Sequence, residues 1–435
     1  MLNLLFKKLK TILQSGTIKN SAMVLMLRLI GMALGYASII LISRLFGAET
    51  YGRFALLLTT AQFLLLIFSL GLPFAIVKLT SDINFFKNNV PQNNYLLYSL
   101  KALLISAIIG AVSIFLLSKF VAVYVFKDVL LIPYLKALSY FFVFLVLHKF
   151  LVEFIKGKKR FTTYGLFLYV LPYVLFFIVF GLMYFNNQNE AEESIYIAYL
   201  LPFLILAITA FFFLPLKKLK TKTSYKYDTL FALAFPMLFS AAFIFISNWT
   251  DIFMLGAMVS KTEVGIYNAA YKVATIALVI ITAINTVLAP KIATLYSENN
   301  IEGIKSEVQK ATKIITFLSI PIFVLVIVFR KQFLSIFGAE FVQGEYALII
   351  IAIGLLFNAV SGSVAQILNM TKHQQELKKF TMITVIINIV LNYILIKHFG
   401  IIGAAIASLV SNVVLNVLCI VFIKKEFNFY AFFKF

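Results

Sequence analysis

Four charged side chains lie within stretches that are otherwise apolar enough to cross a membrane. Arg28, Lys101 and Lys272 are cationic, and the fourth group is Asp251. A charge at this depth costs roughly 2.5–3.5 kcal/mol on insertion scales, so such groups normally face a protein interior or a water-filled cavity. Three cations against one acid favour a cavity that receives an anionic ligand.

Two of these charges can form a structural ion pair. Asp251 and Lys272 are predicted in the outer third of adjacent spans, where they can compensate each other. Arg28 and Lys101 share the inner third, and no acid is predicted at similar depth. The ion pair therefore accounts for Asp251 and Lys272 but leaves Arg28 and Lys101 available for a ligand.

Residue types for enzymatic or metal chemistry are sparse. His148, His373 and His398 are far apart in the sequence, and Cys419 is the single cysteine. The sequence contains no catalytic triad, metal-binding motif or phosphate-binding loop. A membrane polymerase or glycosyltransferase would also be expected to carry a large external catalytic loop. The sequence therefore predicts neither an enzyme nor a metal cofactor.

The composition indicates what kind of protein positions these residues. Of 435 residues, 62% are apolar and 13% are charged, and the mean hydropathy is +0.99. Soluble domains are nearer half apolar and a quarter charged, so the sequence predicts an all-α integral membrane protein. At roughly 20 residues per span, the chain holds about twelve transmembrane helices and no separate soluble domain.

The net charge of +21 follows the predicted topology. Lys and Arg concentrate in the termini and the even-numbered connections, whereas Asp and Glu divide evenly between the two sides. Because cytoplasmic loops collect Lys and Arg, both termini are predicted to be cytoplasmic, and no nucleic-acid partner is expected. The predicted spans are residues 21–43, 54–77, 95–117, 129–148, 164–185, 195–214, 230–257, 265–289, 314–329, 346–370, 380–396 and 401–423.

A shift of 213 residues aligns the two halves of the chain. It places Gly52 over Gly265, Lys78 over Lys291, and Phe154-Ile155 and Lys159 over Ile367-Leu368 and Lys372. Six helices per half is an even number, so the halves are predicted to be parallel repeats. The expected domains are an interfacial amphipathic helix over 1–20, an N-terminal lobe over 21–213, a basic cytoplasmic linker over 214–229, a C-terminal lobe over 230–423 and a cytoplasmic tail over 424–435.

Several segments resemble a known transporter family. The run Leu41-Ile-Ser-Arg-Leu-Phe-Gly-Ala-Glu-Thr-Tyr-Gly-Arg-Phe-Ala55 resembles the turn between the first two helices of bacterial polysaccharide repeat-unit flippases of the Wzx type. These flippases translocate O-antigen, capsule and exopolysaccharide units and belong to the MATE-like multidrug/oligosaccharidyl-lipid/polysaccharide exporter superfamily. The resemblance covers essentially the whole chain. Further similar segments are Asp251 to Gly256, Val264 to Ala270, Ile367 to Lys372 and Gly400 to Ala407.

This resemblance implies a MATE-like fold of two six-helix lobes around a V-shaped cavity. It also implies transport of polyprenyl-diphosphate-linked oligosaccharides from the cytoplasmic to the outer leaflet of the bacterial inner membrane by alternating access. The diphosphate is an anion, so Arg28 and Lys101 are expected to attract it, with Lys78 and Lys291 at the mouth of the cavity. Membrane lipids are further expected partners, while contacts with a polysaccharide polymerase and glycosyltransferases are left open.

Members of the superfamily are often coupled to sodium or proton gradients, which gives Asp251 a second role. With Asn388 and Asn392, one turn apart on the predicted helix 11, Asp251 can supply oxygen ligands for a cation. A proton carrier needs only the carboxylate, and helix 11 has no second acid. Na⁺ and H⁺ therefore both stay open, as does the ion pair with Lys272, and no other cofactor is expected.

Two other transport functions stay open. A MATE-type antiporter expels lipophilic cations such as drugs, and acids rather than bases would be expected in its cavity. A flippase of peptidoglycan-precursor lipids typically resembles a fourteen-helix pattern, whereas twelve spans fit this chain. The charge balance and the span count therefore favour the polysaccharide flippase.

Overall fold

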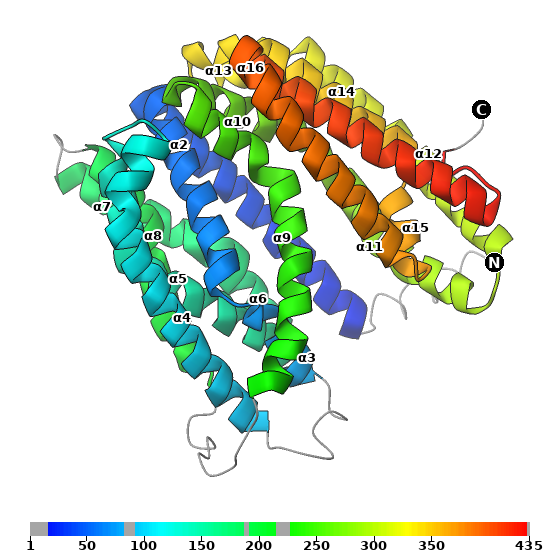
Figure 1. Cartoon of the computed structure of the whole chain (residues 1–435), viewed down its shortest axis with the longest axis horizontal. Helices are drawn as coiled ribbons and strands as arrows, with labels where there is room; N and C mark the ends of the chain where they lie inside the picture. The colour runs from blue at the N-terminus through cyan, green and yellow to red at the C-terminus, as the bar shows by residue number, and fades with distance from the viewer. Residues whose placement is uncertain (1–15, 82–91, 187–190, 215–226, 433–435) are drawn as a thin grey trace, which may run out of the picture. The chain divides into compact units, whose positions relative to one another are not determined.

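The computed structural model describes residues 16–81, 92–186, 191–214 and 227–432 (Figure 1). Over these ranges the regular structure is helical, which confirms the predicted all-α class. Most of the predicted interfacial helix over 1–20 and of the basic linker over 214–229 lies outside the described residues. Those two assignments stay predictions.

In the described ranges, nine helices are long and apolar enough to cross a membrane, or ten if the bent α9 (Tyr227–Met258) counts as one span. Two of the nine exceed a single crossing, because α2 (Gly16–Phe68) has 53 residues and α16 (Gln374–Phe427) has 54. A bilayer needs about 20 residues, so each is long enough to cross twice. Both are interrupted at a glycine with positive φ, Gly47 at 78° and Gly400 at 53°, and both glycines lie between predicted spans. The number twelve stays a prediction.

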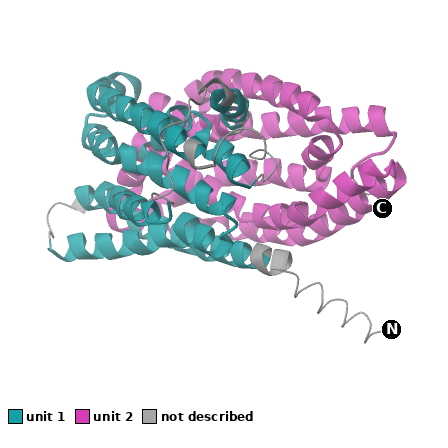
Figure 2. Ribbon diagram, turned by 90° about the horizontal axis from the view of Figure 1, so that it is seen from below, with its two compact units in different colours: residues 1–42, 57–242 teal, residues 43–56, 243–435 magenta. Residues whose placement is uncertain are grey.

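The chain divides into two compact units, coloured separately in Figure 2. Unit 1 contains residues 1–42 and 57–242, and unit 2 contains residues 43–56 and 243–435. This division differs from the lobes expected from the sequence, because 43–56 joins unit 2 and unit 1 extends beyond the predicted linker.

Unit 1 is built around α5 (Leu131–Gly157), which packs against several other helices. Helix α5 is apolar on most of its faces, so it is stable only when other helices surround it. An added Cβ at Gly110 would lie 2.6 Å from the ring of Phe142 on α5, so α4 approaches α5 closely because it has no side chain there. The remaining elements are α3 (Leu72–Ser81), α4 (Gln92–Phe120), η2 (Val121–Val125), α6 (Phe161–Gly165), η3 (Leu166–Val170), α7 (Leu171–Asn186) and α8 (Ala191–Phe211), together with parts of α2 and α9.

Unit 2 is built around α14 (Glu345–Ser361), which packs against α10 (Lys261–Thr275), α12 (Ile301–Val328) and α16. Two predicted spans are divided here. Residues 346–370 form α14 and α15 (Val364–Met370), separated at Gly362, whose φ is 84°. Residues 265–289 are divided between α10 and α11 (Leu278–Ser297). The other elements are α13 (Arg330–Ser335) and η5 (Ala339–Gly344).

Glycine contacts explain why residues 43–56 belong to unit 2. An added Cβ at Gly52 would lie 1.8 Å from the carbonyl oxygen of Lys261, and one at Gly265 would lie 2.1 Å from that of Ala48. Only glycine permits backbones to approach this closely. The contact is reciprocal under the 213-residue shift, which aligns Gly52 with Gly265 and Ala48 with Lys261.

A second repeated feature is a helix ending after α5 and after α15. Lys159 and Lys372, which are aligned by the shift, both have left-handed backbone conformations, with φ of 59° and 65°. Such a residue closes a Schellman-type helix end, in which an amide bonds to the carbonyl five residues earlier. The two halves therefore share a backbone feature at aligned positions. The aligned hydrogen bonds are Arg160 N to Ile155 O at 3.3 Å and His373 N to Leu368 O at 3.0 Å.

Candidate functional site

Asp251 is the centre of a buried polar cluster in unit 2. The residue is 8% exposed, and its carboxylate accepts hydrogen bonds from the hydroxyl of Tyr267 at 2.7 Å and from Nδ2 of Asn392 at 2.7 Å. Asn388 Nδ2 lies 3.4 Å from the same carboxylate, and the hydroxyl of Ser408 also donates to it. The predicted proximity of Asp251 to Asn388 and Asn392 is therefore present in the structure.

The break at Gly400 brings the two arms of α16 to Asp251. Asn392 and Ser408 each lie eight residues from Gly400, so a reversal there places them at about the same depth. The arms approach closely because Gly403 has no side chain. An added Cβ there would lie 2.2 Å from the carbonyl oxygen of Leu395. The fully buried residues that follow it are Ala404, Ala405 and Ala407.

The cluster offers oxygen atoms to a hard cation. Asn392 is 0% exposed, and its Oδ1 accepts no hydrogen bond from the described residues. Asn392 Nδ2 also lies 3.0 Å from Oδ1 of Asn388. An amide carries its donor and acceptor on one group, so a half-turn of the side chain exchanges nitrogen for oxygen beside Asp251. Carboxylate, amide and hydroxyl oxygens are the ligands that hard cations prefer.

Lys272, the other half of the expected ion pair, lies on α10. Its Nζ is 5.9 Å from the ring centroid of Trp249, within the range of a cation–π contact. The hydrogen bonds to Asp251 come from uncharged groups. The choice between an ion pair with Lys272 and a cation or proton at Asp251 stays a prediction.

The residues expected to attract an anion lie on both units. Arg28 on α2, Lys101 on α4 and Lys78 at the end of α3 are all exposed and belong to unit 1. Lys291 on α11 belongs to unit 2, where its ammonium forms an ion pair with Glu307. Lys291 is therefore partly neutralised, whereas Arg28, Lys78 and Lys101 present their charge at the surface of unit 1.

Sequence reasoning missed Tyr267 and Ser408. The position of Ser408 could have been inferred, because Ser408 and Asn392 are equally far from Gly400 in the sequence. In a helical hairpin, residues at equal distances from the turn lie beside each other. Tyr267 had no comparable signal. Its hydroxyl reaches Asp251 through the packing of α10 against neighbouring helices, which one sequence does not reveal.

The sequence profile of the polysaccharide biosynthesis protein family matches residues 17–296, well over half of the chain. The chain belongs to this family. The profile of the MatE family also matches residues 236–394, which include Asp251 and both asparagines. The expected family is therefore confirmed.

Curated relatives of this family member are named for glycan and capsular polysaccharide biosynthesis. The chain is 31% identical over 172 residues to the probable low-salt glycan biosynthesis flippase Agl15 of Haloferax volcanii, covering 39% of this chain and 36% of that protein. It is 25% identical over 268 residues to the capsular polysaccharide biosynthesis protein CapF of Staphylococcus aureus, covering 59% of this chain and 65% of that protein. The match thus spans about a third of the length of Agl15 and less than two thirds of CapF.

Solved structures similar to this family member share its fold. An inward-facing multidrug resistance MATE transporter of the MOP superfamily is similar with a TM-score of 0.70 and 13% identity, over 93% of this chain and 98% of that one. The lipid II flippase MurJ, in an inward closed conformation, is similar with a TM-score of 0.73 and 16% identity, over 94% and 89% of the two chains. At these identities the likeness concerns the fold alone, and it confirms the expected MATE-like fold.

Proposed function

We propose that the chain is a flippase, and not an enzyme, that moves polyprenyl-diphosphate-linked oligosaccharides from the cytoplasmic to the outer leaflet of a bacterial inner membrane. The observation that carries the proposal is the match to the polysaccharide biosynthesis protein family over residues 17–296. The flippase names of two relatives and the MATE-like fold support it. Both termini are cytoplasmic in this proposal, in keeping with the distribution of Lys and Arg.

The diphosphate of the lipid carrier is attracted by the exposed cations of unit 1. Arg28 can bind phosphate oxygens through two parallel N–H groups, whereas Lys101 and Lys78 act as point charges. Each of the three side chains is exposed, so the residues reach a ligand without leaving a packed position. Lys291 contributes less, because it is paired with Glu307.

Transport is coupled to a cation gradient through Asp251. The oxygen-rich cluster of Asp251, Asn388, Asn392 and Ser408 suits sodium, and the carboxylate alone suits a proton. The buried Oδ1 of Asn392 supports sodium. A buried acceptor without a hydrogen-bond donor is destabilising, and coordination of a cation would offset that cost. In this scheme, binding of the cation exchanges the amide donors beside Asp251 for amide oxygens.

The decisive experiment is translocation in liposomes. Purified protein is reconstituted with a fluorescent polyprenyl-diphosphate oligosaccharide, and the accessibility of the label in each leaflet is followed. We expect Arg28→Ala and Lys101→Ala to slow translocation by about tenfold or more, because each loses a charge-assisted contact to phosphate. Lys119→Ala is the matched control, since Lys119 is an exposed lysine on the same helix as Lys101.

Two outcomes would change the proposal. Unchanged translocation in Arg28→Ala and Lys101→Ala would remove the role of these cations while leaving the flippase intact. No translocation of the lipid, together with gradient-driven efflux of a cationic dye, would favour a MATE-type antiporter. The match of the MatE family profile to residues 236–394 is the observation that supports the antiporter as a second candidate function.

A further inference from the structure

The two arms of α16 carry matching polar side chains at equal distances from Gly400. At eight residues the pair is Asn392 and Ser408, and both donate to Asp251. Further pairs follow at twelve and sixteen residues. We call the six side chains the polar ladder: Thr384, Asn388, Asn392, Ser408, Asn412 and Asn416.

The polar ladder extends across much of a membrane's thickness. With a rise of 1.5 Å per residue, its three levels lie about 12, 18 and 24 Å from the turn at Gly400. The hydrocarbon core of a bilayer is about 30 Å thick. Thr384, Asn388 and Asn416 are buried, with 4–6% of each residue exposed. Ser408 and Asn412 are half-buried, so the ladder runs along buried and half-buried positions of unit 2, from Asp251 toward the end that carries Lys424 and Lys425.

Hydrogen bonds orient the amides on the second arm. Asn412 Nδ2 donates to the carbonyl of Ser408 at 3.0 Å, and Asn416 Nδ2 donates to the carbonyl of Asn412 at 2.8 Å. Each amide thus uses its nitrogen on the helix backbone, which leaves Oδ1 as the group it can offer to a ligand. Together with the buried Oδ1 of Asn392, these oxygens form a series of hydrogen-bond acceptors, each about one helical turn from the next along the two arms.

We infer that the polar ladder is the path along which sodium moves between Asp251 and the end of unit 2 near Lys424. The inference rests on the proposed ion coupling at Asp251. The side chains of serine, threonine and asparagine do not ionise near neutral pH, so the ladder suits coordination of a sodium ion better than proton transfer between titratable groups. The alternative role for such amides is to join helices by hydrogen bonds, as polar residues in membrane helices commonly do.

The ladder is closed at the end away from Gly400. The helix face that carries Ser408, Asn412 and Asn416 continues with Cys419 and Ile423, both 0% exposed. These two residues belong to an apolar cluster, the seal, that also contains Phe429 and Ala431 of the C-terminal strap, residues 428–432. Sodium therefore passes this end only when the seal opens.

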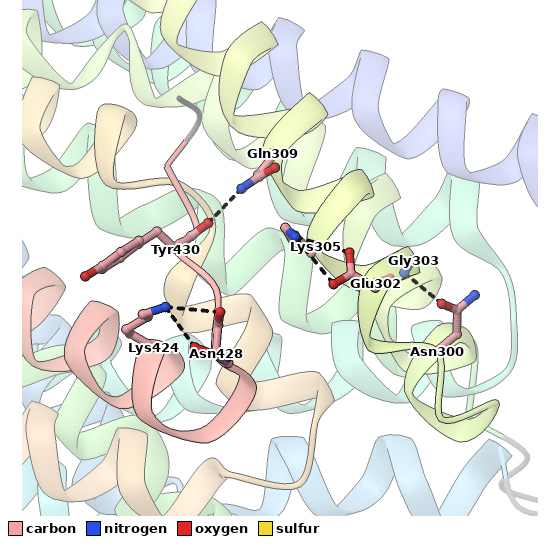
Figure 3. Close-up of polar contacts among 8 residues, drawn as sticks. All are labelled: Asn300, Glu302, Gly303, Lys305, Gln309, Lys424, Asn428 and Tyr430. Atoms are coloured by element: carbon pink, nitrogen blue, oxygen red, sulfur yellow. Dashed lines mark hydrogen bonds and ion pairs between the residues drawn. The ribbon is translucent and has the colours of Figure 1, made fainter. Parts of the chain in front are cut away.

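Polar contacts hold the strap in place (Figure 3). Gln309 Nε2 donates to the carbonyl of Tyr430 at 3.1 Å, and Lys424 Nζ lies 2.9 Å from Oδ1 of Asn428. Thr312 donates to the carbonyl of Ala431 at 3.0 Å, so the strap is tied to α12 as well as to α16.

Binding and release of radiolabelled Na⁺ by the purified full chain test the ladder. Asn416→Leu is expected to bind Na⁺ with unchanged affinity but to release it about tenfold more slowly, because apolar surface replaces a coordinating oxygen. Phe429→Ala is expected to speed release, because it opens the seal. General destabilisation would not produce these opposite signs. Val417→Leu, at the neighbouring exposed position of the same helix, is the control and releases Na⁺ at the unaltered rate.

Two results would overturn the inference, and they are distinguishable. Release from Asn416→Leu at the rate of Val417→Leu, with binding still abolished by Asp251→Asn, overturns the ladder but leaves coupling at Asp251 intact. If Asp251→Asn binds Na⁺ as tightly as the unaltered chain does, the sodium coupling and the ladder are overturned together. If Asn416→Leu does not fold, Asn416→Val offers a smaller apolar side chain and the same expected slowing.

Discussion

The reciprocal contact between Gly52 and Gly265 gives a quantitative prediction. In Gly52→Ala the added Cβ would lie 1.8 Å from the carbonyl oxygen of Lys261, whereas an unstrained contact needs about 3.5 Å. The clashing atom belongs to the backbone, so relief requires α2 and α10 to separate by well over 1 Å. Overpacking of this kind lowers the free energy of unfolding by about 1–3 kcal/mol. Because the clashing atom is part of the backbone and cannot rotate away, we expect the upper value, about 3 kcal/mol, for Gly52→Ala.

The assay is the apparent melting temperature of purified protein in detergent. A loss of about 3 kcal/mol lowers it by roughly 6 °C, since each kcal/mol shifts the midpoint of a large chain by about 2 °C. Gly265→Ala should behave similarly, and the double variant should lose less than the sum, because both substitutions relieve the same contact. Gly181→Ala is the control, because a Cβ there meets no atom within 4 Å.

The control should be neutral or more stable by up to about 1 kcal/mol, since alanine favours helix over glycine. Equal melting temperatures for Gly52→Ala and Gly181→Ala would refute the argument. That result would mean that the helices at Gly52 can move apart without cost, and that the glycine contact does not bind residues 43–56 to unit 2.

Three further outcomes are expected. Lys272→Ala should lower thermal stability because its cation–π contact with Trp249 is lost, and a desolvated contact of this kind contributes about 2 kcal/mol. A loss of about 3–5 kcal/mol would instead indicate a buried ion pair with Asp251. Thr312→Val should raise the rate at which carboxypeptidase removes the strap by about tenfold, since the Ala431 carbonyl loses a buried donor; an unchanged rate would contradict this contact. Asp251→Asn should abolish the gradient dependence of lipid translocation in liposomes, and retained dependence would exclude Asp251 as the coupling group.

Much of the helix order could be predicted from hydropathy, and the positions of the turns from glycine. The break between the first two predicted spans falls at Gly47 and that between the last two at Gly400. Hydropathy missed the first turns of α12, which begin at Ile301 because Asn300 caps the helix and the opening residues are polar. The cap at Asn300 thus allows α12 to begin before the apolar segment that hydropathy detects.

The candidate site could be predicted only in part. Asn388 and Asn392 were predicted beside Asp251 because their amide oxygens can help to coordinate a cation, and they do contact Asp251. The hydroxyl of Tyr267 and the position of Lys272 over Trp249 depend on how side chains pack between helices, which the sequence does not encode locally. The roles of Arg28 and Lys101 stay predictions.

The matching helix ends at Lys159 and Lys372 bear on the history of the chain. A lysine in the left-handed region is disfavoured relative to glycine, yet both halves keep it with the same closing hydrogen bond. The two endings are also aligned by the 213-residue shift, as duplication of one ancestral segment predicts. The turns at 158–160 and 371–373 are therefore exchangeable modules, and a chimaera that swaps them should retain the backbone path of each.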